Sequence, residues 1–484
     1  AVPYHGGIHQ AHAAWTYGHA ACISASRTTD DGLQRRRTDA VRLNLTPHYR
    51  YTLMEQLLHY IWKHRILPLH ELHTTDGRLV EIIDPGLHNH HSGPDFFNAK
   101  IRLDGTLWVG NVEIHERSAD WFLHGHDQDP AYNNVVLHIA STIDMDVMTA
   151  DGSRPPQMEL QVPPHVMQNY QRLLADDRYP PCRDTVMQLP SLAVHSWMSA
   201  LGAERLSSKC DAIDQRVKAA GGSWEQAFFA TIARGFGFGV NSEAFELWAS
   251  GLPFMQVAHH RDDPFQVEAI FLGYAGLLDD DAMNDKQRAL ALADPYFVRL
   301  QREWKYLAHK FHLVSMTRHT WRFMRLRPQN FPYIRLSQLA TLYCSRRADL
   351  SNIVACATLD DVRKALQTEA GDYWRTHYTF GKESAESAKR LSSSSIDVII
   401  INAVVSMLHA YGRHRQDERL IARAAEFLEA LPPEDNTHIR LWRECGISAD
   451  NAADTQSLIQ LHNRYCERKD CLRCRFGYYS MKRI

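Results

Sequence analysis

One predicted β-hairpin constrains the fold of this chain more than any other feature. Residues 96–103 and 107–115 are typical of strands, and Asp104-Gly105 between them is typical of a two-residue turn. That turn fixes a register in which apolar residues share one face: Ile101 opposite Trp108, Ala99 opposite Gly110, and Phe97 opposite Val112. Side chains alternate along a strand, so Glu113 and His115 share the opposite, polar face.

Two acids of this hairpin are typical ligands of a divalent metal ion. Asp95 enters the first strand and Glu113 lies on the second, and Mg²⁺ or Mn²⁺ prefers such carboxylate oxygens. Regular pairing turns Asp95 to the apolar face, so a metal site requires a bulge near Pro94-Asp95 or a three-residue loop in place of the two-residue turn. We expect Glu81 or Glu71 as a third acid, and His115 as the group that orients an attacking water. The alternative is a solvated glutamate and a turn-capping aspartate.

Histidines are concentrated around the same hairpin, in a chain that has 28 of them. His124-x-His126 presents two imidazoles to one ion if the segment is extended, and His138 is predicted to face the same site. Imidazole suits Zn, Mn or Fe better than Mg. A further hypothesis is therefore a hydrolase built on His115, His124, His126 and His138. Taken singly, each of these residues is more typical of a surface or capped histidine.

The cysteines indicate a second metal site rather than a set of disulfides. Their number, nine, is odd and most of them are widely scattered, which is not typical of a disulfide framework. At the end of the chain, Cys466-x4-Cys471-x2-Cys474 has a spacing at which thiolates hold Zn²⁺ or an iron–sulfur cluster. His462 is the predicted fourth ligand, with Cys445 as its competitor. The alternative is three free thiols that pack a C-terminal knob.

The pattern of the chain changes near residue 186. Residues 54–185 combine a helix at 54–64 with several strands, which predicts an α/β domain with a mixed sheet flanked by helices. Long amphipathic segments over 186–440 predict a larger all-helical domain, followed by a helical, cysteine-bearing tail at 441–484. The predicted class is α+β overall. Residues 1–53 lack Lys, Glu, Met and Phe, and are expected to be disordered or an upstream extension before a natural start near Met54.

Composition limits the classes of partner. A net charge of −2 and a pI near 7.0 over 484 residues give no global attraction to polyanions, so a DNA or RNA partner requires a local basic patch. No apolar run reaches the length of a membrane span, and the most apolar stretch, 396–408, is expected to be a buried helix. No secretory signal is recognised at the start. We therefore expect a cytoplasmic location and no membrane partner.

Many motifs of the chain together resemble one bacterial family. They are Gly93-Pro94-Asp95-Phe96, Gly110 to His115, Trp121 to His124 with His126, Tyr132 to His138, Arg325 to Pro328, Asn330 to Pro332, Ile400-Ile401-Asn402, Tyr465-Cys466 and Cys471-x-x-Cys474. In these motifs the chain resembles domain-of-unknown-function family 2851 from Met54 to its end. That resemblance implies no known activity.

Pro94-Asp95 and Glu113-x-His115 also resemble the Pro-Asp and Glu-x-Lys motifs of the PD-(D/E)XK nuclease superfamily. This resemblance implies a restriction-endonuclease-like domain that cleaves nucleic acid with Asp95, Glu113, His115 and Glu81. His115 stands where that superfamily has lysine, and Lys100 lies several residues along the hairpin. The prediction is thus a metal-dependent nuclease or phosphodiesterase. Its competitor is a non-catalytic nucleic-acid-binding or scaffold protein on a degenerate nuclease fold.

Overall fold

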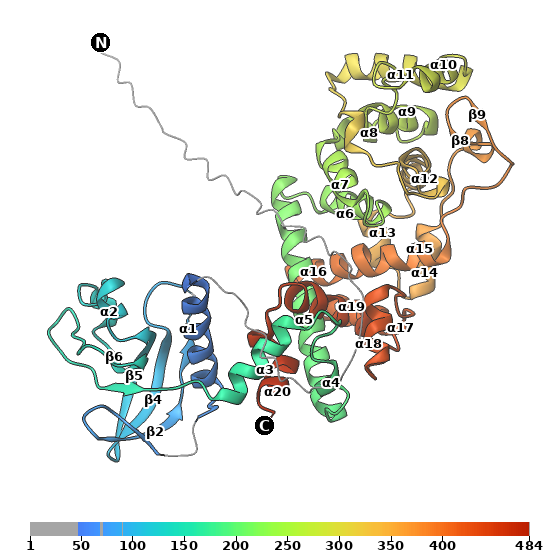
Figure 1. The fold of residues 1–484 in the computed structure, drawn as a ribbon. Coiled ribbons are helices and arrows are strands. Elements are labelled where there is room, and N and C mark those ends of the chain that lie inside the picture. The colour runs from blue at the N-terminus through green and yellow to red at the C-terminus, as the bar shows by residue number, and fades with distance from the viewer. Residues whose placement is uncertain (1–46, 68–70, 90, 484) are drawn as a thin grey trace, which may run out of the picture. The chain divides into compact units, whose positions relative to one another are not determined.

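A seven-stranded mixed sheet dominates the N-terminal part of the computed structural model, which describes residues 47–67, 71–89 and 91–483 (Figure 1). The strands are β1 (Leu72–His73), β2 (Leu79–Asp84), β3 (Leu87–His88), β4 (Phe96–Leu103), β5 (Thr106–Arg117), β6 (Val135–Thr142) and β7 (Gln157–Glu159). They lie in the order β1-β2-β4-β5-β6-β7, with β3 paired to β4. The β5–β6 and β6–β7 pairs are parallel and the others antiparallel, so the predicted mixed sheet is confirmed.

Strands β4 and β5 form the predicted hairpin. Asp104 and Gly105 have φ of 45° and 82°, as a type I′ turn requires at both central positions. Ile101 pairs with Trp108 and Ala99 with Gly110, as expected. Beyond Ala99 the register shifts, because Asn98 takes a φ of 55° in a bulge, and Phe96 instead of Phe97 then pairs with Val112. The irregularity that the position of Asp95 requires is present, but it lies inside β4 and not at Pro94-Asp95.

The sheet curls until its two edges nearly meet. The N–H of Thr75, just after β1, donates to the carbonyl oxygen of Gln157 at the start of β7, at 2.8 Å. Strand β6 is buried on both faces from Leu137 to Ser141, as a central strand of such a sheet must be. The result is a mixed sheet that is almost a barrel. Near-closure leaves little unpaired strand edge.

Helix α1 (Pro47–Lys63) packs against this sheet. Leu57, Leu58, Ile61 and Trp62 are completely buried, and the Trp62 indole N–H donates to the Pro85 carbonyl at 3.0 Å. Burial of each such side chain contributes about 1.5–3 kcal/mol. The helix begins at Pro47, earlier than the predicted start at Met54. Residues 47–53 of the predicted disordered or upstream extension thus belong to α1, and residues 1–46 lie outside the described residues.

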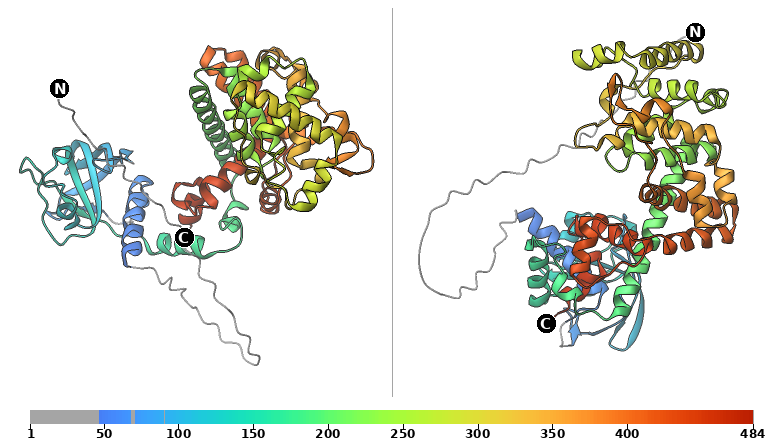
Figure 2. Two further views of the ribbon diagram at one scale, coloured as in Figure 1. Left: turned by 90° about the horizontal axis from the view of Figure 1, so that it is seen from above. Right: turned by 90° about the vertical axis from the view of Figure 1, so that its right-hand side faces the viewer.

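The described chain beyond the sheet is mostly helical (Figure 2), which confirms the predicted all-helical region. Its exception is a short hairpin of β8 (His377–Thr379) and β9 (Lys382–Glu383). The α-helices after α1 are α2 (Asp120–Leu123), α3 (Pro164–Ala175), α4 (Arg183–Val186), α5 (Ser191–Ala219), α6 (Trp224–Phe236), α7 (Ser242–Gly251), α8 (Phe254–Ala258), α9 (Pro264–Tyr274), α10 (Asp285–Leu292), α11 (Pro295–Phe311), α12 (Pro332–Ser345), α13 (Leu350–Ala355), α14 (Leu359–Leu366), α15 (Ser393–Ile399), α16 (Val405–Arg415), α17 (Glu418–Ala430), α18 (Thr437–Glu444), α19 (Ala452–Leu461) and α20 (Arg475–Met481).

The most apolar helical segment runs from Ser393 to Arg415, longer than the predicted 396–408. It consists of α15, a π-helical turn η5 (Ile400–Val404) and α16. By length and composition alone it is apolar enough to cross a membrane, but 61% of its most apolar stretch is buried inside the structure. Ile399, Val404 and Leu408 belong to the core of the helical region. The expectation of a buried helix is confirmed.

Candidate metal centre

Glu113, His115 and His138 extend from two neighbouring parallel strands into one buried site. Strands β5 and β6 pair so that Glu113 lies opposite His138. The three residues are 4%, 1% and 0% exposed, respectively. His115 Nδ1 lies 2.9 Å from His138 Nε2. The structure thus brings together the three polar residues that strand alternation placed on one face.

His124 and His126 reach the same site from the turn after α2. The His126 ring stacks on Tyr132, with 3.8 Å between ring centroids, and its Nε2 lies 3.1 Å from Glu113 Oε1. His124 Nδ1 lies 3.2 Å from His115 Nε2. One ligand atom from each of His115, His124 and His126 lies within 4.8 Å of the other two. Glu113 Oε1, 3.5 Å from His115 Nε2, adds an oxygen to this set of nitrogens.

Asp95 lies directly beside Glu113. Its backbone N–H donates to Glu113 Oε2 at 3.0 Å, and the N–H of Ile114 donates to Asp95 Oδ2 at 2.9 Å. His59 Nε2 is 3.2 Å from the same Asp95 oxygen. The hairpin therefore brings the two predicted acids together, with one oxygen of Glu113 facing Asp95 and the other facing the imidazoles.

Burial sets the charge states of this group. Burial, then the charge of Asp95, raises the pKa of Glu113 well above its usual range. Burial, then the neighbouring imidazoles, holds the pKa of His115 well below its usual range, and burial first of all lowers the pKa of His126 to about 4 and that of His138 to about 3. Burial opposes a proton on His59 as well, but the hydrogen bond and charge of Asp95 outweigh it, and the pKa of His59 is raised. Neutral imidazole is the form that binds metal ions.

Gln157 on β7 contacts His138 at the ring nitrogen that does not face His115. Its Nε2 donates to the Met145 carbonyl at 3.1 Å and lies 3.2 Å from His138 Nδ1. If Gln157 Nε2 donates to His138 Nδ1, the proton of the His138 ring is on its Nε2, which then donates to His115 Nδ1. A cation on His115 Nε2 requires the reverse direction, in which His115 Nδ1–H donates to His138. A partner of this kind fixes the ring orientation of a metal-binding histidine.

Two residues of α1 belong to the site and were missed by sequence reasoning. Glu55 and His59 are four residues apart, so they lie on one side of the helix. Burial first, with the charge of Asp95 also contributing, raises the pKa of Glu55, while His59 and His124 lower it. The available signal was a polar i, i+4 pair on a helix whose other side is apolar.

The predicted third acid is not at this site. Glu81 is exposed on β2 and pairs there with Arg102, its neighbour on β4, at 2.8 Å between charged atoms. Glu71 is also exposed. Glu55 is the additional carboxyl group that the structure places near Asp95 instead. Lys100, the weak substitute for a nuclease lysine, is exposed on β4.

The C-terminal cysteines come together with a different fourth residue from the one predicted. Burial first, then the neighbouring thiols of Cys474, Cys466 and Cys471, raises the pKa of Cys182, which directly precedes α4. His462 instead stacks on His438, with 3.6 Å between ring centroids, and Cys445 is buried next to Arg183 and Asp184. No disulfide links the cysteines of the described residues.

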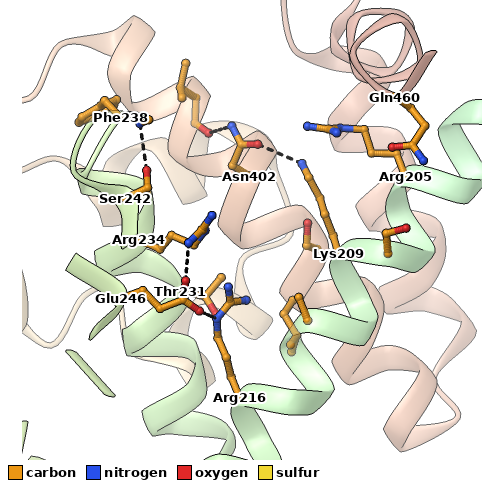
Figure 3. Close-up of a pocket in the computed structure, with 17 residues that line it drawn as sticks. Arg205, Lys209, Arg216, Thr231, Arg234, Phe238, Ser242, Glu246, Asn402 and Gln460 are labelled. Atoms are coloured by element: carbon orange, nitrogen blue, oxygen red, sulfur yellow. Dashed lines mark hydrogen bonds and ion pairs between the residues drawn. The ribbon is translucent and has the colours of Figure 1, made fainter. Parts of the chain in front are cut away.

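A separate cavity of about 670 Å³ lies among helices of the helical region (Figure 3). Lys209 extends into it and donates to Gln456 Oε1 at 2.7 Å and Asn402 Oδ1 at 3.0 Å. Burial, then the charge of Arg205, lowers the pKa of Lys209 to about 7. Arg205, Arg216 and Arg234 also line the cavity, whose lining includes a single acid, Glu246, paired with the last two arginines. The lining therefore carries an excess of positive charge.

Comparison with known proteins places the chain in a family without assigning an activity. The family's sequence profile matches residues 55–437, which include the metal-site residues of the sheet and exclude the C-terminal cysteines. No curated protein and no solved structure matches the chain. No comparison connects it to the PD-(D/E)XK nucleases. The chain belongs to the family described as "Protein of unknown function (DUF2851)".

Proposed function

We propose that the sheet region is a metal-dependent hydrolase whose centre is Glu113, His115, His124 and His126. The observation that carries the proposal is the convergence of three imidazole nitrogens within 4.8 Å, with a carboxylate oxygen 3.1 Å from one of them. A donor set of this kind favours Zn, Mn or Fe over Mg. The geometry thus supports the imidazole-based hypothesis better than the two-carboxylate magnesium site.

The surrounding residues are suited to the proton transfers of a hydrolysis. A bound divalent ion supplies Lewis acidity and lowers the pKa of an attacking water. Asp95, held by the Ile114 N–H and by His59, is placed to accept the proton of that water. Glu55, whose pKa is raised, is suited to return a proton to the leaving group. His124 is the exposed member of the imidazole group, so substrate enters from its side.

The substrate class that we propose is a phosphodiester, in a nucleic acid or in a smaller molecule. An ion held by Glu113, His115, His124 and His126 would supply the Lewis acidity that polarises a phosphoryl oxygen. The small net charge of −2 neither repels nor attracts polyanions strongly, so recognition depends on the local site.

The test combines metal content with hydrolysis. The full chain is loaded separately with Zn²⁺, Mn²⁺, Fe²⁺ and Mg²⁺ and assayed on bis(p-nitrophenyl) phosphate, single-stranded DNA and RNA, with p-nitrophenyl acetate as a substrate without phosphorus. We expect turnover of a phosphodiester with Zn, Mn or Fe, lost in H126A and kept in H309A, a histidine at the end of α11. Stoichiometric metal without phosphodiester turnover overturns the hydrolase but retains the metal site. Activity with Mg²⁺ alone overturns the imidazole centre.

The basic cavity supports a second, independent proposal, which is that the helical region binds a phosphate-bearing anion. Lys209, Arg205, Arg216 and Arg234 outnumber the acids near them, which are Glu246 in the lining and Glu434 beside Arg205 and Lys209. Asn402 lies in the π-helical turn η5, a type of distortion frequent at functional sites. Titration calorimetry with pyrophosphate tests it. We expect binding that is weakened at least about tenfold in a doubly substituted R205A/K209A chain, which loses two cations. Equal binding by wild type and variant rejects the proposal.

A further inference from the structure

Four cysteine sulfurs gather in the helical region, although one of them is far from the others in the sequence. Burial first, then the nearby thiols of Cys474, Cys466 and Cys471, raises the pKa of Cys182. Cys474 also raises the pKa of Cys466 and of Cys471, after burial in each case, and its backbone N–H donates to the Cys471 carbonyl oxygen at 3.3 Å. Cys474 belongs to a buried core against which Cys182 and Cys466 also pack. Three cysteines that are close in the sequence and a fourth that is far from them in the sequence together make a set of four thiols.

Hydrogen-bond donors are directed at these sulfurs. The Tyr179 hydroxyl accepts from Trp442 Nε1 at 2.9 Å and donates to Cys466. The backbone N–H groups of Phe476 and Gly477 donate to Cys474. Donors of this kind favour the charged thiolate over the thiol, and they surround the sulfurs of bound metal clusters.

The Trp197 indole adds an unsatisfied polar group to this environment. Its ring is 7% exposed, and its Nε1–H has no hydrogen-bond partner of ordinary geometry among the described residues. The same indole approaches Cys474 closely enough to lower the pKa of that thiol. A buried donor without a conventional partner is costly, and a negatively charged sulfur cluster provides an acceptor for it.

The local backbone also holds the cysteines in place. Cys466 ends a π-helical turn, η6 (His462–Cys466), which follows α19 directly. Gly477 permits the first turn of α20 to lie against the cysteine loop, since a Cβ at that position would be 2.1 Å from the Cys471 carbonyl oxygen. The loop from Cys466 to Cys474 is therefore fixed from both ends.

We propose that Cys182, Cys466, Cys471 and Cys474 bind an iron–sulfur cluster. All four donors are thiolates, which suit either zinc or such a cluster. A single Zn²⁺ with bonds of about 2.3 Å draws its four sulfurs to within about 4 Å of one another. Among the described residues, ligand atoms within 4.8 Å of one another are found for the imidazole group and not for these sulfurs. A cluster of several atoms spans the wider separation.

The test is the metal content and spectrum of the full chain, purified anaerobically from cells supplied with iron. We expect about four iron and four sulfide per chain, for a cubane cluster held by four cysteines. Absorbance near 400 nm should bleach with dithionite, and the reduced protein should give an electron paramagnetic resonance signal. C182S should lose at least about a quarter of the iron, whereas C445S, which removes a buried thiol outside the group, should keep it.

Several results would overturn this assignment. They are one zinc per chain without sulfide, no metal in the anaerobic protein, and iron and sulfide that persist unchanged in C182S. If C182S does not fold, the iron and sulfide content of the wild type decides the question alone. The outcome is independent of the hydrolase proposal, because no residue of the imidazole centre takes part.

Discussion

The imidazole centre and the four-cysteine group differ in how their residues are brought together. Glu113, His115 and His138 lie on adjoining strands, and the register of those strands places them. Cys182 joins Cys466, Cys471 and Cys474 only through the packing of a helical core. The first arrangement is set by hydrogen-bonded pairing, and the second by tertiary contacts between distant segments. A local motif can therefore be recognised early, whereas a distant ligand becomes visible only in the fold.

The two groups also differ in their donors. The sheet offers nitrogens and an oxygen, which suit borderline ions, and the cysteines offer only soft sulfur. We expect each group to keep its own metal when the other is destroyed. The following predictions test that independence.

The largest effect is expected from removal of a direct ligand in the sheet. E113A or H126A removes one of the converging donor atoms, so zinc or manganese affinity should fall by more than about 100-fold, beyond the usual cost of a supporting residue. Isothermal titration of metal into apoprotein measures it, with H309A as the control. Iron content at the cysteines should not change. Loss of both metals from H126A would contradict the independence of the two groups.

A smaller effect is expected from H138A. His138 contacts His115 and not the proposed ion, so its loss should weaken metal binding by about 10- to 100-fold without abolishing it. The same titration measures this change, and an increase in metal dissociation rate should accompany it. Affinity as low as that of E113A would make His138 a direct ligand.

The variant G477A should affect only the cysteine group. Its Cβ overlaps the Cys471 carbonyl oxygen, which forces the loop apart at a cost of about 1–3 kcal/mol. Iron content should fall and metal binding in the sheet should stay at the wild-type level. G235A is the matched control, because its Cβ would meet Ile399 at 3.4 Å, an ordinary contact. Unchanged iron in G477A would show that the loop adapts.

The smallest effect concerns pH and the basic cavity. Lys209, whose charged neighbours are Arg205 and Glu434, has a pKa near 7, so it becomes protonated as pH falls through that value. Pyrophosphate affinity should therefore rise a few-fold from about pH 8 to pH 6, and K209Q should lose this dependence. The free energy of unfolding should change oppositely, rising between pH 7 and 10.5, because the unfolded chain then binds the additional proton. The same slope in K209Q would assign the titration to another group.

Strand alternation and turn chemistry predicted much of the sheet and part of its site. The Asp104-Gly105 turn and the shared face of Glu113 and His115 follow from local pattern alone. The bulge was needed for Asp95 but misplaced, since a polar Asn98 with positive φ has no strong signal of its own. Glu55 and His59 were missed because the orientation of α1 depends on packing against the sheet, and Glu81 was misassigned because its pairing with Arg102 depends on the neighbouring strand.

The helical character of the second region followed from apolar periodicity over 186–440, as α11 (Pro295–Phe311) illustrates. Periodicity describes which face is buried, but not which helices meet. That limit explains why His462, one helical turn from Cys466, was predicted as the fourth ligand with Cys445 as its competitor, while Cys182 was not considered. Curvature of the sheet was invisible for the same reason, since it depends on contact between its first and last strands.

Gln157 takes part both in the near-closure of the sheet and in the support of the imidazole group. Its backbone carbonyl joins the rims of the curled sheet through Thr75, and its side chain touches the His138 ring. A movement that breaks the Thr75–Gln157 hydrogen bond thus also tilts the His138 ring. Conversely, an ion that holds the imidazoles rigid stabilises that hydrogen bond. Protein loaded with metal should consequently exchange the Thr75 amide hydrogen for deuterium more slowly, which makes one peptide group at the rim a reporter of occupancy in the interior.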